Sequence, residues 1–292
     1  MYDPKTLDAV LAEAEAKVPN ITPGAEKEII WAGGAGAVTD LAVVYIHGFS
    51  ATKYETRPVP DDVAKALGAN LYYARLEGHG RDGAAMAEPT WDEWLQDALQ
   101  ALDVGRAIGQ HVLVMSCSTG CTLTAIALCR EGMDDRVVGN VMISPNFGMA
   151  SKLLNLVLGL PWAEKWLPAI AGKERGFDPI SPEHEKWWTT RYPSQAVFTM
   201  MNTVHAAWKT NPSDCRMPTL VLSSDSDRVV SLDETRRYLK NWGGHVSEEV
   251  LVMGPKDDQN GHLIAGDVFS PTQTKGAVER ILSWWSVFHK AH

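Results

Sequence analysis

Short apolar runs alternate with amphipathic stretches along most of the chain. Apolar runs without polar alternation are typical of parallel strands that are covered on both faces, whereas apolar residues three and four positions apart indicate helices. The alternation predicts an α/β fold with a mostly parallel sheet flanked by helices. We expect strands over 28–31, 41–46, 70–76, 111–115, 137–143, 219–223 and 249–253. We expect helices before Pro19 and over 58–67, 91–108, 119–130, 232–242 and 272–289.

The alternation lapses over residues 147–215, where prolines interrupt helix-like apolar stretches. We therefore expect a core domain formed by residues 1–146 and 216–292, with residues 147–215 inserted as a helical cap. A chain of 292 residues is long enough for one large core with such an addition.

The composition predicts a globular protein that does not bind nucleic acid. Apolar residues make up 45% of the chain and the formal net charge is −9, whereas nucleic-acid affinity depends on Lys and Arg. The longest apolar stretch, 153–162, is shorter than the roughly 20 residues of a membrane helix. Residues 1–17 lack the apolar centre of a secretory signal. We expect a cytoplasmic protein without a membrane span, and the sequence carries no signal for an oligomeric state.

The four cysteines stand at positions 117, 121, 129 and 215. They form neither a CxxC pair nor a Cys/His spacing that is typical of zinc sites. We expect reduced thiols that pack as small apolar groups, and no metal site.

The segment HVLVMSCSTGCTLTA, residues 111–125, indicates a strand that turns sharply into a helix. A nucleophile on such an elbow needs small residues two positions away on each side, as in G-x-S-x-G. With Ser118 at the centre, these positions hold Ser116 and Gly120, whereas Cys117 at the centre would put Met115 there. Ser118 is therefore the predicted nucleophile, although Ser116 departs from the usual glycine.

A second motif, His47-Gly48-Phe49, follows the strand 41–46. Glycine at this point lets the backbone turn so that a following N–H can point at a developing oxyanion, and a second N–H comes from the residue after the nucleophile. We expect the N–H groups of Phe49 and Thr119 to form this oxyanion hole.

An acid and a base follow the last two predicted strands. Asp225 and Asp227 come after the strand 219–223, at the sheet edge where ligands bind in open α/β sheets. We favour Asp227, because Asp225 suits a turn-forming role within its own loop. His262 lies in a polar loop after the last strand, so the order of the candidates is Ser, Asp, His.

Together, HGF at 47–49, LEGHG at 76–80, SCSTG at 116–120, SDSDRVV at 224–230 and NGH at 260–262 resemble the α/β-hydrolase superfamily. Within it they are most similar to the carboxylesterase and monoacylglycerol-lipase-like branch. The similarity spans about residues 28–290, whereas the insertion matches no pattern of the family. In that branch the G-H-G loop lines the site entrance, so the resemblance implies that His79 is a candidate substrate contact.

The mechanism that the resemblance implies is acyl transfer without a cofactor. Ser118 attacks an ester carbonyl, His262 takes its proton, and Asp227 orients His262. Thioester, lactone or carbon–carbon bond hydrolysis would use the same residues, and a non-catalytic receptor on the same fold is a further alternative.

Substrate choice should reside in the insertion, which holds five of the eleven tryptophans. Its composition suits a cap over an apolar acyl or alkyl pocket, and a small-molecule ester is the expected partner. The further candidate contacts are His47, Gly48, Cys117, Trp162 and Trp187.

Overall fold

A twisted sheet of seven strands forms the centre of the protein in the computed structural model, which describes residues 2–160 and 162–289. The strand order is β1-β3-β2-β4-β5-β8-β9, with β1 antiparallel to β3 and every other neighbouring pair parallel. The strands are β1 (Glu28–Ile30), β2 (Thr39–Ile46), β3 (Asn70–Tyr73), β4 (Gly109–Cys117), β5 (Val137–Ile143), β8 (Thr219–Ser223) and β9 (Val246–Val250). The expected fold class is confirmed.

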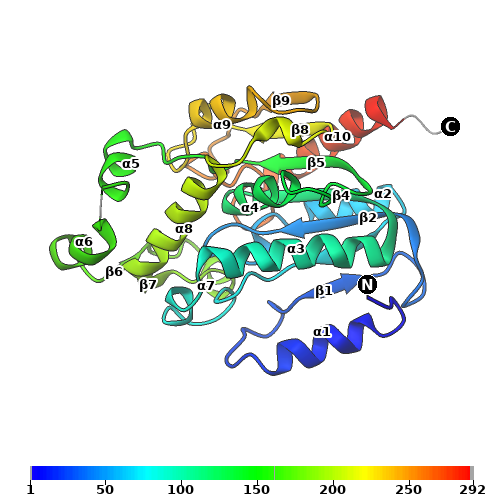
Figure 1. The fold of residues 1–292 in the computed structure, drawn as a ribbon, viewed down its shortest axis with the longest axis horizontal. Helices are drawn as coiled ribbons and strands as arrows, with labels where there is room; N and C mark the ends of the chain where they lie inside the picture. The colour runs from blue at the N-terminus through cyan, green and yellow to red at the C-terminus, as the bar shows by residue number, and fades with distance from the viewer. Residues whose placement is uncertain (1, 161, 290–292) are drawn as a thin grey trace.

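Helices cover both faces of this sheet (Figure 1). One face packs against α1 (Leu7–Ala16), α3 (Trp91–Ile108), α4 (Thr119–Leu128) and α9 (Leu232–Leu239). The other packs against α2 (Val59–Ala66) and α10 (Pro271–Phe288), which also contact each other. The helix α3 begins at a capping box, in which the Thr90 side chain accepts the Glu93 N–H and the Glu93 side chain accepts the Thr90 N–H.

The predicted boundaries hold within a few residues for most elements, and those of α3, β5 and β8 match in full. The last strand differs most, since β9 ends at Val250 rather than at 253. As an edge strand it has a largely exposed surface, so its SEEV run lacks the apolar character on which the prediction relied. The apolar residues that follow lead the chain toward the carboxyl edge of the sheet, and Leu251 still donates its N–H to the Ser223 carbonyl.

Residues 147–215, which the sequence predicts to be an inserted cap, are called the insertion below, and residue 161 lies outside the described residues. It contains α5 (Lys152–Leu158), α6 (Ala163–Ala171), α7 (Pro182–Trp187) and α8 (Ser194–Ala207). It also contains an antiparallel pair, β6 (Glu174–Gly176) with β7 (Arg191–Pro193), which the sequence did not predict. Short 3₁₀ helices occur at η1 (Lys53–Glu55), η2 (Ala85–Ala87) and η3 (Pro212–Asp214).

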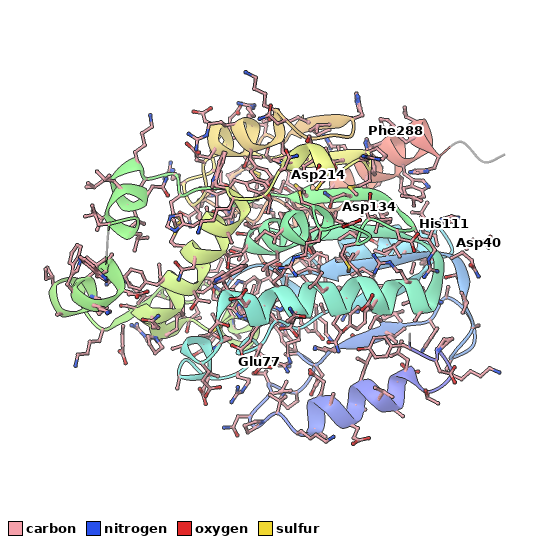
Figure 2. All side chains as sticks on the ribbon, viewed as in Figure 1. Asp40, Glu77, His111, Asp134, Asp214 and Phe288 are labelled. Carbon is pink, nitrogen blue, oxygen red and sulfur yellow. The ribbon has the colours of Figure 1, made fainter. Side chains whose placement is uncertain are left out.

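The insertion lies beyond the carboxyl ends of the parallel strands, at the left of Figure 1. Asp40 and His111, near the starts of β2 and β4, lie at the opposite end of the sheet (Figure 2). The insertion is anchored through α8, which packs against α4. The loops that follow β2, β4, β8 and β9 therefore meet beneath the insertion. Residues 1 and 290–292, at the ends of the expected core domain, lie outside the described residues.

The helices of the described chain include none that is long and apolar enough to cross a bilayer. The four cysteines are free thiols, and only Cys129 is partly exposed.

Candidate active site

The turn between β4 and α4 holds Ser118 in a strained conformation. Its φ of 50° and ψ of −117° lie in a region that residues other than glycine rarely adopt, and this strain is typical of a nucleophile elbow. Gly120 has no room for a side chain, because an added Cβ would lie 2.3 Å from the Ile46 carbonyl oxygen. The steric rule that singled out Ser118 in the sequence therefore has a direct counterpart in the contact between the elbow and β2.

The two residues before Ser118 that also carry a hydroxyl or thiol group belong to β4 itself. Ser116 and Cys117 are both fully buried, and burial raises the pKa of the Cys117 thiol well above its ordinary value. Ser118, by contrast, is 7% exposed and lines a cavity that is described below.

His262 connects Ser118 to an acid. Its Nε2 lies 3.0 Å from the Ser118 Oγ and its Nδ1 lies 2.8 Å from the Asp227 Oδ2. These contacts fix the neutral tautomer, since an Nδ1–H that donates to the carboxylate leaves Nε2 free to accept the serine proton. The structure thus brings together three residues that stand far apart in the sequence.

Of the two neighbouring acids, Asp227 is the one that contacts His262. Asp227 accepts the Val229 and Val230 N–H groups on Oδ1 at 2.8 and 2.9 Å, which leaves Oδ2 for His262. Asp225 instead points outward, with 76% of its side chain exposed and Arg236 3.9 Å away.

The electrostatic surroundings of His262 favour its protonated form. Burial disfavours the imidazolium, but the Asp227 carboxylate outweighs burial, with help from Asp258 and Glu55, so that the pKa of His262 is raised above its ordinary value. The ring is therefore a stronger base than a free histidine, which suits proton removal from a serine.

The loop that carries His262 is held by a carboxylate that the sequence analysis missed. Asp258 accepts the His262 and Leu263 N–H groups on Oδ2, both at 2.9 Å, and the Asn260 N–H on Oδ1. The Ser144 hydroxyl donates to the His262 carbonyl. The sequence carries no local sign that Asp258 accepts these N–H groups, because the bonds form only when the loop folds back on its own carboxylate.

The two backbone N–H groups that the sequence predicts as oxyanion donors lie close to Ser118 in the sequence or in the cavity lining. Across residues 2–160 and 162–289, neither the Phe49 N–H nor the Thr119 N–H donates to an acceptor. Thr119 is the first residue of α4, whose N–H groups point out of the helix end, and Phe49 lines the cavity. Thr119 is fully buried and Phe49 is partly exposed, so the Thr119 N–H is a buried donor without a partner in the described part of the chain.

A cavity of about 720 Å³ opens over Ser118 and His262. Most of its lining is apolar, and the insertion supplies a large part of it, including Leu158, Leu167, Val197, Phe198 and Met200. Val268 and Phe269 line it from the core side. Such a volume and lining match an organic ligand with a sizeable apolar part.

The expected contacts near the elbow lie behind this cavity rather than in its wall. His47 and His79 are fully buried and their rings lie 5.0 Å apart. The Cys117 side chain points into the core on the α2 and α10 side. Gly48 lies between Ser118 and Glu55, since an added Cβ would be 3.0 Å from atoms of both. These four residues support the site from beneath.

The tryptophans of the insertion differ in their surroundings, and most of those described below do not line the cavity. Trp162 is 71% exposed, and Trp187 is stacked on Tyr54 at 3.6 Å, so neither lines the cavity. Trp208 donates to the Phe147 carbonyl. Trp188 is the tryptophan of the insertion that lines the cavity.

Among the described residues, no group of three His, Cys, Asp or Glu side chains is arranged to hold a metal ion.

Known proteins share both the sequence pattern and the fold. A sequence model of the alpha/beta hydrolase family matches residues 43–267. Because this match covers most of the chain, the protein belongs to the α/β-hydrolase family.

Within that family the similar proteins include monoacylglycerol lipases and other lipolytic enzymes, which confirms the resemblance to the monoacylglycerol-lipase-like branch. The thermostable monoacylglycerol lipase of Bacillus sp. (strain H-257) is 26% identical over 192 residues, which are 65% of this chain and 72% of that protein. A structure from work on LipS and LipT, two metagenome-derived lipolytic enzymes, has a TM-score of 0.72 at 21% identity and covers 93% of this chain and 100% of its own. The monoacylglycerol lipase of Paleococcus ferrophilus has a TM-score of 0.60 at 13% identity, over 90% of this chain and 98% of its own.

Proposed function

We propose that the protein is a serine hydrolase that cleaves carboxylic esters of apolar acyl or alkyl groups. The observation that carries the proposal is the continuous chain of contacts from Ser118 through His262 to Asp227 at the base of the apolar cavity. A strained serine with an adjacent oriented base has the geometry of an activated nucleophile.

The proposed reaction proceeds in two steps. The Ser118 Oγ attacks the ester carbonyl carbon while His262 Nε2 takes the hydroxyl proton, and the imidazolium then protonates the leaving alcohol. Water, deprotonated by His262, attacks the resulting acyl-serine ester; the acid is released and the imidazolium returns its proton to the Ser118 Oγ. Asp227 takes no proton from His262, and its carboxylate stabilises the imidazolium in both steps.

The N–H groups of Phe49 and Thr119 are the proposed donors to the oxyanion of each tetrahedral intermediate. Both lack an acceptor in the described part of the chain, and both adjoin Ser118 through the elbow and the Gly48 contact. Preorganised donors of this kind contribute about 10²–10³ to kcat.

The insertion is proposed to act as a cap that selects the substrate by its apolar part. It supplies the side chains that line one wall of the cavity. That the relatives include two monoacylglycerol lipases and further lipolytic enzymes supports an acyl ester as substrate class.

Hydrolysis of p-nitrophenyl esters from acetate to dodecanoate tests the proposal. We expect kcat/KM to rise from acetate to a medium chain, because each methylene that enters the cavity contributes up to about 0.8 kcal/mol. Ser118→Ala should abolish turnover, whereas Ser213→Ala, at an exposed serine in η3, should keep it. Activity that is highest with acetate and falls steadily with length would contradict the substrate class, and full activity of Ser118→Ala would contradict the mechanism.

A further inference from the structure

A buried carboxyl that belongs to none of the recognised motifs lies beside the proposed oxyanion hole. Glu55, the last residue of η1, is 1% exposed and lines the cavity. Its Oε1 accepts the Gly48 N–H at 2.6 Å and the Tyr45 hydroxyl at 2.8 Å. A buried carboxyl is costly unless its bonds serve the fold or the site, and one of these bonds is made to the loop that carries Phe49.

Each of the two peptide groups that flank Gly48 makes a hydrogen bond to a side chain. Its N–H donates to Glu55, and its carbonyl lies 2.9 Å from Nδ1 of His47. The Leu76 N–H donates to Nε2 of that ring at 3.0 Å, so the neutral ring carries its proton on Nδ1 and donates it to Gly48. The Gly48 carbonyl and the Phe49 N–H belong to one planar peptide group, which His47 holds directly. Glu55 holds the preceding peptide group, which is joined to the first at the Gly48 Cα.

The same glycine shows how closely the carboxyl approaches the nucleophile. A Cβ added at Gly48 would lie 3.0 Å from the Glu55 Oε2 and 3.0 Å from the Ser118 Cβ. Gly48 is therefore packed between the Glu55 carboxyl on one side and Ser118 on the other. A small displacement of Glu55 would move the Gly48 loop relative to Ser118.

We infer that Glu55 is a positioning residue of the proposed hydrolytic site, whose carboxyl holds the Gly48 peptide so that the Phe49 N–H points at the developing oxyanion. The inference rests on the proposed function. It assigns to η1 a part in transition-state stabilisation that acts through Gly48 and not through contact with substrate.

The charge of Glu55 adds a second effect on the same site. Burial raises the pKa of Glu55 to about 7, against the opposing influence of its bonds from Tyr45 and Gly48 and of His262. The other titratable groups that face it are the buried thiols Cys117 and Cys121, whose pKa values burial raises, so both stay neutral. In either protonation state Oε1 can accept the Gly48 N–H, whereas only the ionised form stabilises the imidazolium of His262.

Three substitutions separate position from charge. Glu55→Gln keeps an oxygen for Gly48 and removes the charge, Glu55→Asp keeps the charge and withdraws the acceptor by one methylene, and Glu55→Met removes both. Asp61→Asn, which removes a partly exposed carboxylate of α2 from outside the cavity, is the matched control. For each variant, kcat and KM on p-nitrophenyl butyrate are measured across pH, together with the melting temperature and the extent of fluorophosphonate labelling.

We expect Glu55→Met and Glu55→Asp to lose at least about tenfold in kcat, approaching the 10²–10³ cost of a lost oxyanion donor, with KM changed less than about twofold. Glu55→Gln should keep kcat within about threefold at its plateau, while the acid limb of its kcat/KM profile moves to lower pH, because His262 loses a neighbouring negative charge. Asp61→Asn should change neither quantity.

The positioning role is overturned if folded Glu55→Met and Glu55→Asp both turn over at the wild-type rate, and the effect of the charge is overturned if the acid limb of Glu55→Gln stays in place. If Glu55→Met does not fold, Glu55→Asp and Glu55→Gln decide the matter. A wild-type protein that neither hydrolyses esters nor is labelled would refute the proposed function itself, whereas an active, labelled wild type with indifferent Glu55 variants would refute only this inference.

Discussion

Replacing Asp227 with Asn should reverse the proton arrangement on His262 while leaving the fold intact. The Val229 and Val230 N–H groups donate to Oδ1, so they hold the carbonyl oxygen of an asparagine in that place. The amide NH₂ must then occupy the position of Oδ2, 2.8 Å from Nδ1. It donates to Nδ1, which drives the imidazole proton onto Nε2, and Nε2–H cannot accept the Ser118 proton.

The magnitude follows from the loss of the base. In a serine protease the equivalent change lowers kcat about 10⁴-fold, which corresponds to about 5 kcal/mol of transition-state stabilisation. We expect a similar loss here with KM nearly unchanged, because Asp227 contacts no part of the substrate. Stability should fall by less than about 1 kcal/mol, since both backbone donors keep a partner.

The assay is steady-state hydrolysis of a p-nitrophenyl ester, with urea unfolding as the stability measurement. Asp225→Asn is the matched control, because Asp225 is an exposed acid two residues away, and it should retain activity within about twofold. A loss below about tenfold in Asp227→Asn would refute the reasoning, as would a larger loss in Asp225→Asn.

Three further predictions follow from the site. Burial lowers the pKa of His262, but Asp227, Asp258 and Glu55 together raise it above its ordinary value, so kcat/KM should fall toward acid with a midpoint above about 6.5, the ordinary histidine value; a midpoint below about 6 would contradict this. Gly120→Ala places a Cβ 2.3 Å from the Ile46 carbonyl oxygen, so urea unfolding should show a loss of about 3 kcal/mol or more, and a loss under about 1 kcal/mol would count against the close contact. Val197→Trp should fill part of the cavity and shift the preferred p-nitrophenyl ester to a shorter acyl chain, whereas an unchanged chain-length profile would place the acyl group elsewhere.

The fold could be predicted from the sequence because its signals are local. An apolar run such as 137–143 can be buried on both faces only inside a covered sheet, and the structure has β5 with those bounds. The predicted bounds of the edge strand β9 were wrong, since an exposed strand needs no apolar pattern. The β6–β7 pair was missed because its hydrogen bonds join residues separated by a helix.

The candidate site was predictable only in part, for a related reason. Ser118, Asp227 and His262 follow motifs whose chemistry requires those residue types. Glu55 and Asp258 hold the loops on which that chemistry depends, yet they follow no motif, because the loops are held through backbone N–H groups that any residue carries. The positions of Trp162 and Trp187 depend on how the insertion packs, which composition does not encode.

Mass spectrometry of the protein after reaction with a fluorophosphonate tests the central claim most directly. A fluorophosphonate forms a covalent bond with an activated serine, so fragmentation of the peptide that spans the elbow shows which atom was the nucleophile. We predict a single adduct on Ser118 that is absent from Ser118→Ala and strongly slowed in Asp227→Asn. An adduct on Cys117, or no adduct on an otherwise folded protein, would contradict the account.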